Sequence, residues 1–255
     1  MLLSLKGKVA VVTGSTIGID FAISKEFAEN NDATVIVCSR SKQSAVKSAE
    51  EIKGKTFAAE IDVTNSSSIK RFLQQIVSDH ERIDILINNA GYPFDRKIWY
   101  KKFHEITDDE VYRIIEVDLK GSVHLSMAVL HSMLQNNLEE WVIINISSTP
   151  AIAGHIEGAS YTIAKAANIA LTKCILLEYG GKNIRAYTLA LDNIATLAKY
   201  YSMNENDRNK AAEEPSMGRW GRPEEVAKVA VCIASDNFSF ATGNTIVIDG
   251  GTVLL

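Results

Sequence analysis

The sequence predicts an α/β fold in which a doubly wound parallel sheet is covered by helices on both faces. Short apolar runs alternate with longer segments of helical periodicity along the whole chain, which is typical of β-α-β units. No linker, low-complexity run or internal repeat interrupts this alternation. The chain has 255 residues, of which 46% are hydrophobic, enough for one large core. We therefore expect a single domain over residues 1–255 with a seven-stranded sheet.

The expected elements follow one another in a regular order. Strands are predicted where short apolar runs end at polar or glycine residues, at 8–13, 33–38, 55–60, 84–88, 141–147, 183–189 and 244–248. Helices are predicted where apolar residues recur at helical spacing, at 17–30, 42–53, 66–80, 108–135, 159–180 and 223–235. The stretches 92–107 and 191–217 break the rhythm. Both follow strand ends, where open α/β sheets bind ligands, so we expect them to be functional or mobile.

A glycine-containing turn joins the first predicted strand to the first predicted helix. It covers residues 14–20, Gly-Ser-Thr-Ile-Gly-Ile-Asp, and its spacing differs from the common G-x-G-x-x-G pattern. Such a turn lets backbone N–H groups approach a phosphate at the positive end of a helix. Ser39 and Arg40 follow the second strand, about 20 residues further on, where the ribose of a dinucleotide is recognised. The pattern favours a Rossmann-type dinucleotide site over ordinary turn glycines.

A tyrosine and a lysine four residues apart form a second candidate site. Tyr161 and Lys165 lie in the predicted helix at 159–180, so their side chains share one face. A nearby ammonium favours the ionised form of a phenol, which can pass a proton to or from a carbonyl or alcohol oxygen. The hydroxyl of Ser148, thirteen residues upstream of Tyr161, would help to hold charge on that oxygen. On its own, Y-x-x-x-K also fits an ordinary surface helix.

Taken together, these motifs resemble the short-chain dehydrogenase/reductase family over nearly the whole chain. The matching segments are Thr13–Gly18, Asp62-Val63, Asn88–Gly91 and the set Ser148, Tyr161 and Lys165. Two further segments, Gly218–Glu225 and Asp249–Gly251, are similar to motifs of its acyl-carrier-protein reductase and sugar dehydrogenase branches. Each motif is weak alone, whereas all of them in family order are specific. The resemblance also implies a small substrate lid near 191–217, with a helix near 195–212.

The resemblance assigns roles to individual residues. It implies that Tyr161 is the general acid or base, that Lys165 favours its ionised form and holds the nicotinamide ribose, and that Ser148 binds the reacting oxygen. Ser147 is expected to be structural. Asp118 joins the catalytic set because it stands where the family has an asparagine that holds a water chain to the lysine. A backbone role would survive this change, whereas a carboxylate would alter the charge balance around Lys165. The implied cofactor-binding residues are Gly14, Ser15, Thr16, Ile17, Gly18, Ile19, Ser39, Arg40, Asp62, Val63, Asn89, Ala90, Gly91, Tyr161, Lys165, Ile194 and Thr196.

The residues after the second strand also bear on the choice of cofactor. Enzymes that use NAD often place an acid there, which accepts from the ribose hydroxyls. Ser39 and Arg40 instead offer a hydroxyl and a guanidinium, which suit a 2′-phosphate, and Ser41 and Lys42 add to them. We therefore predict NADP, with NAD as the alternative. A solvated arginine on a loop is the simpler explanation of the same residues.

The predicted activity is hydride transfer between a nicotinamide and a carbonyl or secondary alcohol carbon. The resemblance favours a ketoreductase, with a 3-oxoacyl thioester as one candidate substrate, and a sugar or polyol dehydrogenase as the alternative. Asp20, Asp118 and Leu191-Asp192 depart from the family pattern, which leaves open a nucleotide-binding relative with weak catalysis. The segment 92–103 is rich in aromatic and basic residues and is expected to be either a substrate flap or a subunit contact.

Composition limits the expected partners. The net charge is −4 without an extended basic cluster, so we expect no nucleic-acid partner. The three cysteines and five histidines lack disulfide or metal-ligand spacing, so we expect reduced thiols and no metal. No leader or membrane span is recognised, so a cytoplasmic location without membrane contact is predicted. The resemblance implies a homo-oligomer, usually a tetramer, with the helices at 108–135 and 159–180 and the C-terminal end at its interfaces.

Overall fold

Seven parallel strands form the sheet in the computed structural model, which describes residues 3–135, 140–197 and 199–254. In spatial order they are β3 (Lys55–Glu60), β2 (Thr34–Ser39), β1 (Val9–Thr13), β4 (Ile85–Asn88), β5 (Trp141–Ser148), β6 (Ile184–Leu191) and β7 (Thr245–Ile248). The order reverses between β1 and β4, whose carboxyl ends lie side by side. Such a switch point is where this kind of sheet binds its ligand. The predicted fold class is confirmed.

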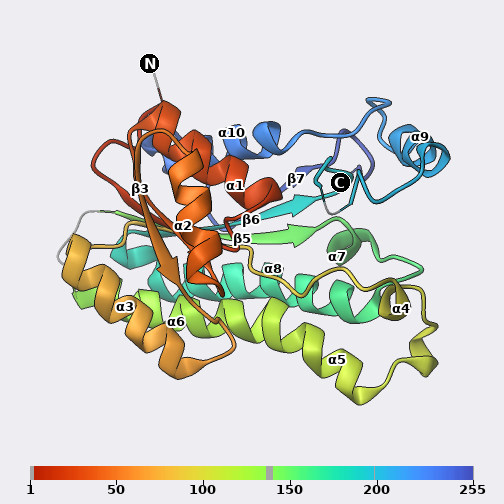
Figure 1. The fold of residues 1–255 in the computed structure, drawn as a ribbon, viewed down its shortest axis with the longest axis horizontal. Helices are drawn as coiled ribbons and strands as arrows, with labels where there is room; N and C mark the ends of the chain where they lie inside the picture. Colours follow the sequence, from red (N-terminus) through yellow and green to blue (C-terminus); the bar gives the residue numbers. More distant parts are fainter. Residues whose placement is uncertain (1–2, 136–139, 198, 255) are drawn as a thin grey trace.

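Helices cover both faces of the sheet (Figure 1). One face carries α1 (Gly18–Lys25), α2 (Lys42–Glu51) and α10 (Pro223–Ala234), and the other carries α3 (Ser66–His80), α6 (Ser122–Gln135) and α8 (Ala159–Tyr179). Phe27 and Val226 are fully buried in the first core layer, and Phe72 and Leu125 are buried in the second. The strands between these layers are buried on both sides, which explains why they are continuous apolar runs rather than alternating ones.

The predicted strand bounds agree with the structure to within two residues. The largest difference is at β6, predicted to end at 189, which continues to Leu191 because Leu191 pairs in register with Ile248 of β7. Two predicted helices are interrupted by π-helical turns: η1 (Glu26–Asn30) follows α1, and η3 (Glu116–Gly121) separates α5 (Asp108–Ile115) from α6. Apolar periodicity does not reveal such turns, which frequently mark functional sites.

Short helical segments fill the regions that the periodicity left irregular. They are α4 (Arg96–Trp99), η2 (Phe103–Glu105), α7 (Pro150–Ala153), η4 (Gly180–Lys182), α9 (Glu205–Glu213) and η5 (Asp236–Phe238). The first turn of α9 is capped by Asn204, whose side chain accepts from the N–H of Asp207. Figure 1 shows α4, α7 and α9 beyond the carboxyl ends of β5 and β6. Within the described ranges, no helix combines the length and the apolar character that a bilayer span requires.

Candidate active site

A cavity of about 320 Å³ brings together the two motifs that the sequence singled out. The residues that line it are Gly14, Ile17, Gly18, Ile19, Asp20, Asn89, Ala90, Gly91, Tyr92, Asp118, Tyr161, Lys165, Thr196 and Leu197. They come from the turn after β1, the end of β4, the π-helical turn η3, helix α8 and the segment after β6. The cavity therefore lies at the switch point of the sheet, with the Tyr161 helix beside the glycine turn.

The glycine turn has the backbone of an anion-binding site. Gly14 and Gly18 have φ of +75° and +70°, a region that disfavours side chains with a Cβ. Helix α1 begins at Gly18 without a side-chain cap, so its first N–H groups are left for a ligand. A Cβ on Gly14 would lie 3.4 Å from Ala90 Cα, so the turn and the β4 end approach each other closely. These features fit the phosphates of a dinucleotide.

Hydroxyl groups hold this turn against the neighbouring strands. Ser15 is fully buried, and its Oγ donates to Val12 O at 2.7 Å and accepts from the N–H of Cys38 at 2.8 Å. Thr13 Oγ1 accepts from the N–H groups of Asn89 and Ala90, both at 3.0 Å. The side chain of Ser15 thus joins β1 to β2 rather than lining the cavity, which leaves only its backbone for the predicted cofactor contact.

Tyr161 and Lys165 lie on one face of α8 as predicted, and both line the cavity. Lys165 Nζ lies 5.6 Å from the centre of the Tyr161 ring. The ammonium donates to Ile146 O at 3.2 Å and lies 3.3 Å from Asp118 Oδ1. An ammonium has three protons, and these contacts use two of them. The third has no acceptor among the residues that the structure describes, and it is left for a ligand in the cavity.

Asp118 forms a buried ion pair with Lys165, which is the second of the two roles that the sequence left open, a backbone role and a change in the charge around the lysine. Its Oδ2 also accepts from the N–H of Tyr92 at 2.7 Å. Its carbonyl is already bonded, because Asn168 Nδ2 donates to it at 2.8 Å. Burial by itself would lower the pKa of Lys165, but the attraction to Asp118 and Tyr161 outweighs burial and raises that pKa. The carboxylate of Asp118 therefore favours the protonated form of Lys165.

Asp20, which departs from the family pattern, also lines the cavity. Its side chain is 4% exposed and points away from solvent to the end of β4, where Asn89 Nδ2 donates to Oδ2. Burial raises the pKa of Asp20 to about 7, against the opposing effects of Asn89 and Lys165. The sequence showed that position 20 departs from the family pattern, but it did not show where the side chain points.

The two serines at the end of β5 have different partners. Ser147 is buried, and its Oγ donates to Lys165 O at 2.8 Å, as a structural hydroxyl would. Ser148 is half-buried and its Oγ donates to Leu191 O at 3.0 Å. Ser148 does not line the cavity described above, so its hydroxyl must leave Leu191 O before it can donate to a substrate oxygen. The extension of β6 to Leu191 supplies that competing acceptor.

The residues predicted for the adenosine half of the cofactor lie outside this cavity, at the ends of β2 and β3. Arg40 is exposed, and its guanidinium has no hydrogen-bond or ion-pair partner among the described residues. Asp62 Oδ1 accepts from the N–H and the hydroxyl of Thr64, which closes a turn. Val63 is buried against Gly121, where a Cβ would lie 2.6 Å from Val63 Cγ2. A free cation at this strand end suits an additional phosphate.

An aromatic side chain that sequence reasoning did not single out contacts the tyrosine. The Trp99 ring centre lies 5.5 Å from that of Tyr161, and Trp99 Nε1 donates to Glu157 at 3.2 Å. The N–H of Gly158, the residue before α8, donates to Trp99 O at 2.9 Å. Gly158 has φ +67°, and a Cβ there would lie 2.6 Å from the Trp99 ring. The aromatic richness of 92–103 was the available signal, but not which ring points inward.

The segment after β6 contributes the remaining cavity residues. Thr196 and Leu197 line the cavity, and Thr196 Cγ2 is 3.5 Å from a Cβ placed on Gly18. Ile194 is buried and forms an isolated parallel bridge with Gly221, so it supports this segment without lining the cavity. The lid role expected of 191–217 stays a prediction.

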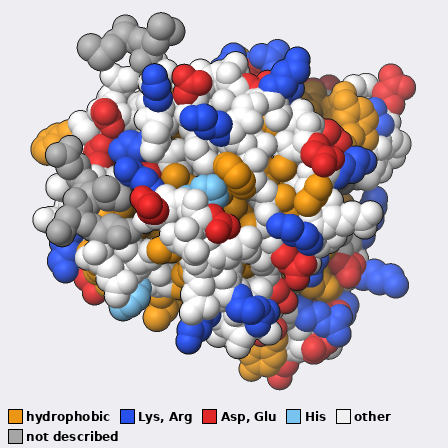
Figure 2. Space-filling model, turned by 60° about the vertical axis from the view of Figure 1, so that its left-hand side comes forward, with side chains coloured by type: hydrophobic (Ala, Val, Ile, Leu, Met, Phe, Trp, Pro, Cys, Tyr) orange, Lys and Arg blue, Asp and Glu red, His pale blue; other side chains and the backbone are white. Residues whose placement is uncertain are grey.

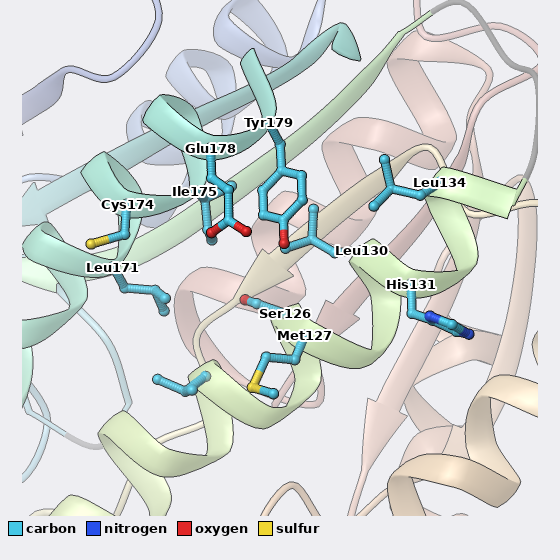
Figure 3. Close-up of a pocket in the computed structure, with 11 residues that line it drawn as sticks. Ser126, Met127, Leu130, His131, Leu134, Leu171, Cys174, Ile175, Glu178 and Tyr179 are labelled. Carbon is cyan, nitrogen blue, oxygen red and sulfur yellow. The ribbon is translucent and has the colours of Figure 1, made fainter. Parts of the chain in front are cut away.

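A second hollow, of about 310 Å³, lies between α6 and α8 (Figure 3). Its labelled side chains are mainly apolar, with Met127 and Leu134 on α6 opposite Leu171 and Ile175 on α8. Figure 2 shows acidic and basic side chains interspersed over one face of the molecule. Among the described residues, no group of three or more candidate metal ligands occurs. The expectations about subunit contacts and nucleic acid stay predictions.

Comparison with known proteins shows similarity to reductases and dehydrogenases over nearly the whole chain. The family model described as enoyl-(acyl carrier protein) reductase matches residues 14–253. The chain is 36% identical to the 3-oxoacyl-[acyl-carrier-protein] reductase FabG of Thermotoga maritima, over 98% of this chain and 99% of the relative. It is 30% identical to glucose 1-dehydrogenase 2 of Bacillus subtilis, over 100% of this chain and 98% of the relative. The fold of this chain matches that of a 3-ketoacyl-(acyl-carrier-protein) reductase from Brucella melitensis, solved in complex with NADH, with a TM-score of 0.90. The two chains are 27% identical, and the match covers 98% of this chain and 100% of the other.

Proposed function

The chain belongs to the short-chain dehydrogenase/reductase family, and from that premise we propose that it is a ketoreductase in which Tyr161 is the acid that protonates the reacting oxygen. The chain is an oxidoreductase that uses a nicotinamide cofactor. The single observation that carries the proposal is the position of Tyr161 and Lys165 in the same cavity as the glycine turn. When bound, the nicotinamide supplies a hydride to the carbonyl carbon.

Each residue of the site then has a task that its contacts support. The backbone of residues 14–19 holds the phosphates, and Asn89, Ala90 and Gly91 form the floor beside them. Lys165 is held protonated by Asp118 and keeps one proton for a ribose hydroxyl. Tyr161 donates its hydroxyl proton to the carbonyl oxygen. Ser148 turns from Leu191 O and steadies the same oxygen.

Replacing Tyr161 with phenylalanine tests this assignment. The variant keeps the ring that packs against Trp99 and loses only the proton donor. We expect turnover of a ketone panel, including a 3-oxoacyl thioester, to fall by about 10²- to 10⁴-fold, the usual contribution of a positioned acid. Binding of the dinucleotide, followed by fluorescence, should change little. Unchanged turnover would remove Tyr161 from the mechanism, whereas tight dinucleotide binding by the wild type without turnover would indicate a nucleotide-binding protein.

The finer identity of the substrate and cofactor is part of the same proposal. Relatives named as 3-oxoacyl-[acyl-carrier-protein] reductases support a 3-oxoacyl thioester, and glucose 1-dehydrogenase 2 supports a sugar as the second candidate. The free guanidinium of Arg40 supports NADP over NAD, although the Brucella melitensis neighbour was solved with NADH. Arg40→Ala should weaken the binding of NADPH about tenfold, as the loss of one charge-assisted contact does, and leave the affinity for NADH unchanged. Equal losses for both would contradict a 2′-phosphate contact.

Assembly and location complete the proposal. We expect a homotetramer, and the apolar hollow between α6 and α8 is the surface that supports an association between copies. A cytoplasmic location and the lid role of 191–217 are proposed on the family resemblance.

A further inference from the structure

Asp20 places a second acid in the dinucleotide cavity, and one of its two carboxyl oxygens lacks a partner. Asn89 Nδ2 donates to Oδ2, whereas Oδ1 is buried and has no hydrogen-bond partner in the structure. The side chain is 4% exposed and lines the cavity beside Gly14 and Gly18. A buried oxygen without a partner is costly in any protonation state. Its position in the first turn of α1, where phosphates are expected, places this buried carboxyl near the negative charge of the ligand.

The charges around Asp20 decide which form of the carboxyl a phosphate would tolerate. The other ionisable groups that line the cavity are Lys165 and Tyr161 from α8, Asp118 from η3 and Tyr92 after β4. Asp118 already pairs with Lys165, so these two groups carry no net charge together. An ionised Asp20 therefore leaves the cavity with one negative charge, which repels a diphosphate. A protonated Asp20 leaves the cavity neutral and turns the unpartnered oxygen into a possible donor.

From this geometry we infer that Asp20 binds a proton together with the dinucleotide, so that the cavity receives the cofactor and one proton from solvent as a unit. The inference rests on the proposed function, because it requires a dinucleotide in this cavity. The proton converts the buried carboxylate to a neutral carboxylic acid, while Oδ2 keeps its bond from Asn89. No covalent bond of the cofactor changes in this step. Asp20 is a binding residue here, not an acid of the ketone reduction.

The expected signature is a dinucleotide affinity that depends on pH. Burial raises the pKa of Asp20 to about 7 in the free protein, and the charge of a bound diphosphate raises it further. Well below pH 7 the residue is already protonated, so affinity should change little with pH. Well above pH 7 the free protein has lost this proton and binding must take it up, so the Kd should rise by up to about tenfold per pH unit.

Calorimetry with NADH tests the inference directly. NADH is the probe because it lacks the 2′-phosphate, whose ionisation near pH 6 would add a proton change of its own. At about pH 7.5, titrations in two buffers of different ionisation enthalpy should give different apparent heats, equivalent to an uptake of about 0.5 to 0.8 proton. This comparison uses the wild-type protein alone, so it does not depend on whether a variant folds.

Asp20→Asn is the matched variant, since the amide is neutral at every pH and keeps a donor. Its Kd for NADH should be flat from about pH 6 to 9, its proton uptake should be zero, and at about pH 8 it should bind about tenfold more tightly than wild type. Equal heats in both buffers, or a flat wild-type Kd, would overturn the inference while leaving the proposed function intact. If neither NADH nor NADPH binds at any pH, the proposed function fails as well.

Discussion

The two walls of the cavity are built in different ways. The inner wall, residues 13–20 and 88–91, consists of short turns at the ends of β1 and β4 that backbone N–H groups and small hydroxyls hold together. The outer wall, formed by the long segments 92–105 and 191–217, reaches the cavity through Tyr92, Thr196 and Leu197, and aromatic rings hold these segments in place. Trp99 packs on Tyr161, and Trp220 packs on Tyr200 at 5.2 Å between ring centres. The inner wall is thus fixed locally, and the outer wall is fixed by contacts distant in sequence.

This difference separates two kinds of function. Turns with glycines at positive φ admit few alternatives, so the inner wall suits a ligand part that does not vary, such as a diphosphate. Long segments between secondary-structure elements tolerate substitution, so the outer wall suits the variable part of a substrate. Mutations that act on one wall should leave the other wall's ligand unaffected.

The largest effect is expected at Asp118, which joins the walls. It pairs with Lys165, its Oδ1 would lie 3.1 Å from a Cβ placed on Gly91 of the inner wall, and it accepts from the N–H of Tyr92, the first residue of the outer wall. Asp118→Ala leaves a buried ammonium without its counter-charge, so we expect the free energy of unfolding to fall by about 3 to 5 kcal/mol. Urea unfolding at neutral pH measures this change.

Glu116→Gln is the control for Asp118→Ala, because it breaks an exposed ion pair on the same π-helical turn. Glu116 lies 3.2 Å from Lys120, and both side chains are about half exposed. Its loss should cost at most about 0.5 kcal/mol. If Asp118→Ala is no more destabilising than Glu116→Gln, the buried pair does not connect the walls as described.

Trp99 tests whether the outer wall acts on the substrate alone. Trp99→Ala removes the ring that packs on Tyr161 and the bond to Glu157. We expect kcat/KM for a ketone substrate to fall about tenfold, since the phenol loses the packing that orients it. The Kd for the dinucleotide should stay within about twofold of wild type, a limit of about 0.4 kcal/mol, because the Trp99 ring packs on Phe94, His155 and Tyr161, which are not inner-wall residues.

Phe103→Ala is the matched control in the same segment, since that side chain is 71% exposed. It should leave both constants unchanged. A loss of dinucleotide affinity in Trp99→Ala as large as its loss of kcat/KM would mean that the walls are not independent.

The contrast between the walls also explains what the sequence could predict. The sheet, its covering helices and the glycine turn depend on local patterns, and the strand bounds were accurate to within two residues. The pairing of Tyr161 with Lys165 on one helix face was predictable for the same reason. The outer wall was not predictable, because it depends on contacts such as that between Gly158 and the Trp99 ring, which are about 60 positions apart in the sequence.

The acids at positions 20 and 118 show a second limit. Both were recognised as departures, but a carboxylate in a sequence does not reveal its depth or its partner. Asp20 is buried against Asn89, and Asp118 faces Lys165. Their roles follow from desolvation and from the charge of a specific neighbour, which only the three-dimensional arrangement supplies.

The smallest effect on stability is expected at Glu225, which lies in the first turn of α10 and holds the end of the outer wall through Arg219. Its carboxylate accepts from both Arg219 guanidinium nitrogens at 2.9 and 2.8 Å and from the N–H of Arg222 at 2.8 Å. Arg219 precedes Trp220, whose Nε1 donates to Arg208 O of α9. Glu225→Gln should therefore destabilise the protein by about 1 kcal/mol at neutral pH, the scale of a lost capping interaction at a partly exposed site.

The pH dependence distinguishes this anchor from simple packing. The hydrogen bonds from Arg219 and the Arg222 backbone lower the pKa of Glu225 to about 2 from its usual 4.5. A depressed carboxyl pKa contributes stability that is complete above about 4.5 and is lost as the pH falls toward 2. The stability gap between wild type and Glu225→Gln should thus shrink as the pH falls from about 4.5 toward 2, as thermal unfolding would show. Glu224→Gln, which changes the adjacent carboxyl at the exposed start of α10, is the control and should show no such stability gap. If the gap for Glu225→Gln is independent of pH, the effect comes from packing, and the outer wall lacks this electrostatic anchor.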